Sequence, residues 1–192
     1  MGNVNVFVNG YGAPKDPLSD GNLCGYMCAI SEYMDLHHDD VFTLYLAGGI
    51  TNRKDMTEAR AMKVWFDAHG LPANVTEVVL IEESTTARDN VALYSRKVDQ
   101  GKPSVFFFEY SRRLQMIFLV KQYFNRHFHR LYKFCGVKFD EPSMELRNRL
   151  KQYFLRFPLE VLSWYLPSVR EKISKPLRAR HIARARQDYN KS

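Results

Sequence analysis

Three segments of the sequence carry carboxylate, hydroxyl and guanidinium groups directly after runs of apolar residues. Glu58 begins an amphipathic stretch, Glu82 and Ser84 follow one apolar run, and Ser111 and Arg112 follow another. Carboxylates can accept hydrogen bonds from a ligand or move a proton, and a guanidinium group binds phosphate or carboxylate in a fork geometry. These residues predict a polar binding site, provided that the fold brings the three segments together.

Each of these residues also has a purely structural interpretation. A carboxylate such as Glu58 in the first turn of a helix is stabilised by the helix dipole. Glu82, Glu83 and Glu109 lack a firm metal-binding spacing, which is typical of solvated loop acids, so no metal site is predicted. Asn90 falls inside a predicted helix, where asparagine has a low propensity, so we expect it to tie its loop to a neighbour. Both interpretations stay open, and no catalytic residue is assigned.

The elements that must position these residues follow a strand–loop–helix pattern that occurs four times. Apolar and β-branched runs predict strands, and 3.6-residue periodicity predicts the helices between them. A doubly wound, mostly parallel, Rossmann-like α/β sheet follows from this alternation, and such sheets bind ligands outside the carboxyl ends of their strands. The predicted strands are Asn3–Asn9, Thr43–Ala47, Asn74–Ile81, Ser104–Phe108 and a short fifth at Cys135–Phe139; the predicted helices are Leu23–Leu36, Thr57–Gly70, Thr86–Val98 and a long one ending near Phe134.

Glycines mark two of the four loops. Gly10 and Gly12 follow the first strand, and Gly48 and Gly49 follow the second, shortly before Thr51. Glycine lets the backbone turn sharply and lets a ligand come close. Because the first N–H groups of a helix have no partner inside it, we expect those after Gly49 to face an anion or a polar ligand. The alternative is that the two glycines only turn the chain.

Composition indicates a globular protein. The chain has 192 residues, of which 45% are hydrophobic, and its three cysteines form no CxxC pair. Disorder is therefore excluded, no disulfide scaffold is expected, and a reducing, cytoplasmic environment is expected. No signal-peptide pattern is seen in the first twelve residues, and no stretch reaches 18 apolar residues, so a membrane span is not predicted.

The net charge of +7 is concentrated at one end of the chain. From Arg147 onward, twelve Lys and Arg residues stand against three Asp and Glu residues, and the preceding part is slightly acidic. This shift divides the chain into a Rossmann-like domain, 1–140, and a basic helical extension, 141–192. The extension mixes basic with aromatic and aliphatic residues, which suits packing on the domain or peripheral attachment to an anionic membrane surface. A solvated face is the alternative, and nucleic-acid binding is not expected, because no nucleic-acid-binding signature accompanies the charge.

Several short motifs occur in order along the first four strand–loop–helix units: Leu46–Gly49, Thr57–Ala59, Gly70–Pro72, Glu82–Ser84 and Asp89–Asn90. Together they resemble the SanA/ElyC/YdcF-like family, a bacterial domain of unknown biochemical function. The resemblance covers roughly residues 4–113. It departs from the family pattern at Ala87, where threonine is usual, at Asp89, where glutamate is usual, and at Ser111, where a histidine is common.

The resemblance implies a fold and a pocket more than a reaction. The family is linked to cell-envelope polysaccharide homeostasis, and S-adenosylmethionine binding has been associated with it. We therefore expect a small polar or nucleotide-like ligand, with S-adenosylmethionine as a candidate. A hydrolase or transferase acting on an envelope glycan or phosphorylated precursor is the alternative, with Glu58, Glu82 or Glu109 moving the proton. The predicted ligand-binding residues are Gly10, Gly12, Gly48, Gly49, Thr51, Glu58, Glu82, Ser84, Asn90, Ser111 and Arg112.

Overall fold

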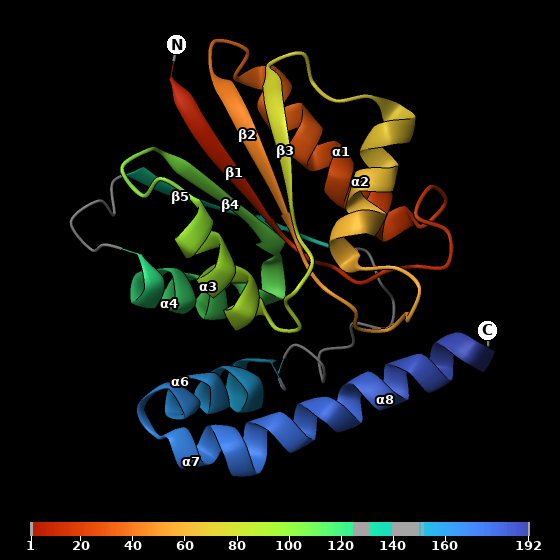
Figure 1. The fold of residues 1–192 in the computed structure, drawn as a ribbon, viewed down its shortest axis with the longest axis vertical. Helices are drawn as coiled ribbons and strands as arrows, with labels where there is room; N and C mark the ends of the chain where they lie inside the picture. Colours follow the sequence, from red (N-terminus) through yellow and green to blue (C-terminus); the bar gives the residue numbers. More distant parts are fainter. Residues whose placement is uncertain (1, 125–130, 140–149, 151, 192) are drawn as a thin grey trace.

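A computed structural model describes residues 2–124, 131–139, 150 and 152–191. At its centre lies a five-stranded sheet in the order β3-β2-β1-β4-β5, and every neighbouring pair is parallel (Figure 1). This architecture confirms the predicted Rossmann-like α/β class. The strands are β1 (Asn3–Asn9), β2 (Val41–Ala47), β3 (Val75–Ile81), β4 (Ser104–Glu109) and β5 (Tyr132–Val137).

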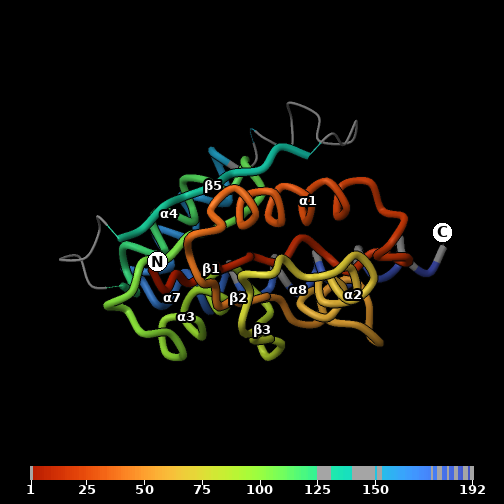
Figure 2. Tube along the Cα trace, turned by 90° about the horizontal axis from the view of Figure 1, so that it is seen from above, coloured from red at the N-terminus to blue at the C-terminus, as the bar shows by residue number. Residues whose placement is uncertain are grey.

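Helices cover both faces of the sheet, because side chains along a buried strand alternate between the two sides. Val6 and Val8 of β1 pack with α1 (Gly21–Leu36) and α2 (Glu58–His69). Phe7, between them, packs on the other side with α3 (Ala87–Lys97) and α4 (Arg113–Tyr123). Figure 2 shows α1 and α3 on opposite sides of β1. The sheet is therefore doubly wound, with one apolar core on each face.

Side-chain caps set the starts of the first three helices; α1 begins two residues before the predicted Leu23, and α2 and α3 each begin one residue after the predicted Thr57 and Thr86. The Asp20 carboxylate accepts from the N–H of Leu23 at 2.7 Å, and the Thr57 hydroxyl accepts from the N–H of Arg60 at 3.0 Å. At α3 the cap is Thr86, which accepts from the N–H of Asp89 at 2.6 Å. Each cap satisfies an N–H that has no partner inside its helix.

The prediction of one long helix ending near Phe134 is wrong. Helix α4 ends at Tyr123, and β5 begins at Tyr132, three residues before the predicted fifth strand. The reason is tertiary: Phe134 pairs with Phe106 of β4 in the ladder and stacks on its ring at 5.4 Å, and Tyr132 lies 5.4 Å from Phe124. Aromatic residues of this kind suit a strand as well as a helix, so burial against β4 decides between them.

The C-terminal extension lies beyond the carboxyl ends of the strands (Figure 1). Trp164 anchors it, because its ring lies 5.0 Å from Tyr123 and 6.2 Å from Phe118 of α4. Within the extension the sequence pattern also predicts a helix from Ser143 to Phe157, and most of it lies outside the described residues. Among the residues that are described, no helix is both long and apolar enough to cross a membrane. The extension comprises a π-helical turn η3 (Gln152–Arg156), α6 (Phe157–Tyr165), α7 (Pro167–Val169), a second such turn η4 (Arg170–Ser174) and α8 (Lys175–Lys191).

Burial affects the thiol of one cysteine. Cys135 on β5 is half-buried, whereas Cys28 on α1 is exposed. Burial raises the pKa of the Cys135 thiol, and the positive charge of Lys133 offsets the shift only in part. A raised pKa leaves less of the nucleophilic thiolate at a given pH. We therefore expect iodoacetamide at pH 8 to label Cys28 before Cys135, and Cys135 labelling to rise only at higher pH, as measured by peptide mass spectrometry. Faster labelling of Cys135 than of Cys28 at pH 8 would contradict this.

Candidate functional site

The loops after β1, β2, β3 and β4 meet at one edge of the sheet, which we call the carboxyl edge. Strand order reverses between β1 and β4, because β1 pairs with β2 on one side and with β4 on the other. In doubly wound sheets this reversal opens a crevice at the carboxyl ends of the strands. The four predicted loops therefore converge at this edge.

Glu58 fills the space beside two of the predicted glycines. A Cβ atom at Gly10 would overlap Oε2 of Glu58, and one at Gly48 would lie 2.6 Å from both that oxygen and the Cβ of Glu58. Oε1 of Glu58 accepts a hydrogen bond from the Thr51 hydroxyl at 2.6 Å. The Glu58 carboxylate therefore occupies the space that side chains at Gly10 and Gly48 would take. Through this packing Glu58 joins the loops after β1 and β2.

Gly49 has a similar packing role against the loop after β3. A Cβ atom there would overlap the backbone carbonyl oxygen of Ser84 and would lie 2.5 Å from that of Glu82. Gly12 differs from these glycines, since nothing lies within 4 Å of the place its Cβ would take. Of the four predicted glycines, only Gly12 leaves open space beside the backbone.

The expectation that the start of α2 faces a ligand is wrong. The N–H of Glu58 donates to the carbonyl of Gly49 at 3.1 Å, and the N–H of Ala59 donates to that of Gly48 at 2.9 Å. The glycine turn therefore folds back onto the helix and satisfies the N–H groups that we expected to meet an anion.

Glu82 braces the same helix from the end of β3. Its carboxylate accepts from the Thr57 hydroxyl at 2.6 Å and lies 3.3 Å from the guanidinium of Arg60. Thr57 thus caps α2 and also contacts Glu82. In this structure the carboxylate is engaged with the protein.

Asn90 joins its segment to a neighbouring loop by hydrogen bonds, as predicted. Its Nδ2 donates to Oδ1 of Asn9 at 3.0 Å and lies 3.4 Å from the carbonyl oxygen of Ala47, so α3 is joined to the ends of β1 and β2. Asn9 and Asn90 are 2% and 4% exposed, which places a polar pair inside the carboxyl edge. Ser84 is also buried beside them, and its hydroxyl has no hydrogen-bond partner among the described residues.

The loop after β1 is held by the loop after β2. Asn52 bonds both backbone groups of Ala13, accepting from its N–H at 3.0 Å and donating to its carbonyl at 2.9 Å. Arg53 donates to the carbonyls of Pro14 and Lys15 at 2.9 and 3.0 Å. These contacts order the long connection that leads from β1 to the start of α1.

The end of β4 carries the predicted Ser111 and Arg112, in the short 3-10 helix η1 (Tyr110–Arg112). Glu109 accepts from the N–H of Ser111 at 2.9 Å and lies 3.9 Å from the guanidinium of Arg112. Burial raises the pKa of Tyr26 on α1 well above its ordinary value, while the charges of Arg112 and Glu109 act on it in opposite directions. Glu109 is the last residue of β4 and Arg112 lies in η1 directly after it, on the strand that neighbours β1 where the strand order reverses.

Two further basic side chains gather around η1. Arg156 as a whole is exposed to solvent, but its guanidinium group is partly desolvated. This desolvation lowers the pKa of Arg156, and the positive charge of Arg112 lowers it further. The ammonium of Lys138, just after β5, lies 6.0 Å from the ring of Tyr110. We call Arg112, Lys138 and Arg156 the basic cluster.

A hollow of about 350 Å³ opens beside this cluster. Its floor is aromatic, since Phe139 contacts Tyr11 and Tyr26 with ring centroids 4.7 and 5.3 Å apart. Two glycines of α1 keep the hollow free of side chains on that side. The lining residues are Gly21, Asn22, Gly25, Lys138 and Phe139.

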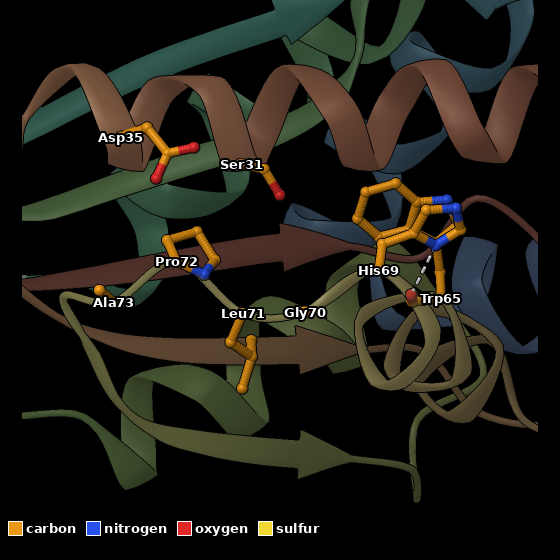
Figure 3. A pocket seen from close by; sticks show the side chains of 8 residues that line it. All are labelled: Ser31, Asp35, Trp65, His69, Gly70, Leu71, Pro72 and Ala73. Atoms are coloured by element: carbon orange, nitrogen blue, oxygen red, sulfur yellow. Dashed lines mark hydrogen bonds between the residues drawn. The ribbon is translucent and has the colours of Figure 1, made fainter.

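A second hollow, of about 360 Å³, lies away from the carboxyl edge (Figure 3). It is bounded by Ser31 and Asp35 of α1, by the turn that precedes β3, and by Trp65 and His69, whose rings stack at 4.2 Å. Because this turn leads into the amino end of β3, the hollow is remote from every predicted ligand-binding residue. It has no group of basic side chains like that around η1.

Several residues that shape the carboxyl edge were not predicted. Asn9, Asn52 and Arg53 brace the loops, and Arg156 and Arg186 reach the edge from the C-terminal extension. Arg186 of α8 donates to the carbonyl of Thr51 at 3.1 Å. Only Asn9 had a usable signal in the sequence, as a polar residue that ends an apolar strand before a glycine. Within the described ranges, no three His, Cys, Asp or Glu side chains come together to hold a metal ion.

The fold and this edge define a doubly wound, Rossmann-like α/β protein with a basic cluster beyond the ends of β4 and β5. Comparison of the chain with protein-family models, with curated proteins and with solved structures gives no match.

Proposed function

We propose that the protein binds a small polar, nucleotide-like ligand with an anionic group at the crevice between β1 and β4. The observation that carries the proposal is the basic cluster: η3, which holds Arg156, packs against η1, which holds Arg112, beside the point where strand order reverses. A phosphate or carboxylate would relieve the repulsion between Arg112 and Arg156 and gain charge-assisted hydrogen bonds. The neighbouring hollow, with its aromatic floor and its glycines, would take the uncharged part of the ligand.

In this proposal the predicted residues have different tasks. Arg112 contacts the anionic group, and Gly12 leaves room for the ligand beside the loop after β1. Glu58, Glu82 and Asn90 hold the loops in place through the hydrogen bonds described above. S-adenosylmethionine, whose amino-acid end carries a carboxylate, stays a candidate, as does a role in envelope homeostasis of the kind that the SanA/ElyC/YdcF-like resemblance implies.

Calorimetric titration with S-adenosylmethionine, nucleoside diphosphates and nucleotide sugars tests this proposal. We expect at least one of them to bind, and expect Arg112→Gln and Arg156→Gln each to weaken its binding by about tenfold or more, because a hydrogen bond to a charged group contributes roughly 1.5–3 kcal/mol. Arg96→Gln is the matched control, since Arg96 is exposed on the last turn of α3. Failure of all these ligands to bind, or equal affinity in the wild type and both arginine variants, would refute the proposal.

Glu58→Ala in the same titration separates bracing from direct contact. Because Glu58 is engaged with Thr51, Gly10 and Gly48, we expect this variant to lose stability, with a smaller change in affinity than Arg112→Gln. The alternative, a hydrolase or transferase, would need a carboxylate to move a proton. Glu58, Glu82 and Glu109 each already accept hydrogen bonds from neighbouring residues, so no contact in the structure favours this alternative over binding.

A further inference from the structure

One side of helix α6 packs against α3 and α4. Glu160 lies 3.5 Å from the guanidinium of Arg88 on α3, and the Ser163 hydroxyl accepts from the same guanidinium at 3.2 Å. The Arg88 guanidinium also lies 4.5 Å from the ring of Trp164. Glu160, Ser163 and Trp164 therefore all face α3 and α4.

The other side of this segment is apolar and exposed. We call it the outer face, and it consists of Phe154, Leu155, Leu162, Tyr165 and Leu166, which are 76%, 53%, 46%, 65% and 50% exposed. Leu162, Tyr165 and Leu166 follow the i, i+3, i+4 spacing of one helix face, and Phe154 and Leu155 precede them by about two turns. A water-facing helix normally carries polar residues on this side, so an outer face of this composition indicates a binding surface.

The charge of the neighbouring chain indicates what covers the outer face. From Pro167 onward the extension holds eight Lys and Arg residues against two acids, and Arg170, Lys172, Lys175 and Arg180 are exposed. Apolar and aromatic side chains beside basic ones are what an interfacial helix needs, since anionic headgroups attract the basic residues and the acyl boundary takes the apolar ones. A second copy of the chain would instead bring an equally basic extension against this one, and like charges repel.

We infer that the outer face and the basic residues after it dock the protein on an anionic lipid surface. Phe154, Leu155, Leu162 and Leu166 enter the boundary of the acyl chains, and Tyr165 lies at the headgroup level, where its ring and hydroxyl are both accommodated. The attachment is peripheral and weakens when salt screens the basic residues.

Co-sedimentation of the full chain with vesicles tests the inference. Vesicles of phosphatidylcholine alone are compared with vesicles that also contain phosphatidylglycerol, at low and high salt. We expect binding to the anionic vesicles, weakened by high salt. Because each leucine contributes to burial of apolar surface, we expect the double variant Leu162→Ser and Leu166→Ser to lower the partition coefficient by about tenfold or more.

The matched control is Leu18→Ser with Leu36→Ser, two exposed leucines far from the extension in sequence, which are 44% and 71% exposed. It removes the same number of exposed leucines and is expected to bind vesicles as the wild type does. The inference is overturned if the wild type does not bind anionic vesicles, or if both double variants bind equally. It is also overturned if light scattering finds a dimer that Leu162→Ser with Leu166→Ser dissociates, because a second copy would then cover the outer face.

Discussion

Replacing Gly49 with alanine is expected to lower the free energy of unfolding by on the order of 3 kcal/mol. The new methyl group would overlap the carbonyl oxygen of Ser84 and meet that of Glu82 at 2.5 Å, and both are backbone atoms. The loop after β3 cannot easily withdraw, since the N–H of Gly48 donates to the carbonyl of Ile81 at 2.9 Å. Urea unfolding followed by circular dichroism measures the change.

Gly25→Ala is the control for this substitution, and its effect should have the opposite sign. Gly25 lies inside α1, and nothing is within 4 Å of the place where its Cβ would be. Alanine in a helix interior is more favourable than glycine by roughly 0.5–1 kcal/mol, so this variant should be slightly stabilised. Equal stability of Gly49→Ala and the wild type would show that the loops after β2 and β3 do not pack as described.

Replacing Glu160 with alanine should lower the free energy of local unfolding of α6 by roughly 3 kcal/mol, because the substitution leaves the charge of Arg88 buried without a carboxylate. The side chains of Arg88 and Glu160 are 8% and 17% exposed, so water screens the pair poorly. Since 1.4 kcal/mol corresponds to a factor of ten, we expect amide hydrogens of α6 to exchange about a hundred times faster. Hydrogen exchange with mass spectrometry resolves α6 from the sheet.

The double variant Arg88→Met with Glu160→Leu tests whether charge is the cause. Replacing both members of a buried pair with apolar residues of similar volume is often neutral, so exchange in α6 should return close to the wild-type rate. If Glu160→Ala alone exchanges at the wild-type rate, the ion pair does not hold the extension. If the double variant is as loose as the single one, packing rather than charge is responsible.

Sequence reasoning located the carboxyl edge but interpreted part of it wrongly. It placed Gly10, Gly48, Glu58, Ser84 and Asn90 at one edge because alternating strands and helices force parallel strands, whose ends then lie together. It treated the glycines as openings for a ligand. In the structure Glu58 occupies the space at Gly10 and Gly48, because a pattern shows where side chains are missing and not which neighbour fills the gap.

The basic cluster was beyond prediction for a related reason. Arg112, Lys138 and Arg156 are separated by 26 and 18 residues along the chain. Arg112 lies in η1, Lys138 just after β5, and Arg156 in η3. Their approach depends on β5 being added beside β4 and on the extension folding back over η1. Local periodicity predicts neither the addition of β5 nor the folding of the extension. The start of β5 was also hard to recognise, because residues 132–134 resemble the continuation of a helix.

The sequence by itself determined the class of fold, four of the five strands, the approximate places of the first three helices and the basic character of the last quarter of the chain. Apolar periodicity and capping residues act over a few positions, so they can be recognised without the rest of the molecule. Only the tertiary structure decided the strand order, the use of Glu58 as a brace and the inward direction of Glu160 and Ser163. These features depend on contacts between residues far apart in the chain, where burial and pairing of charges outweigh local preference.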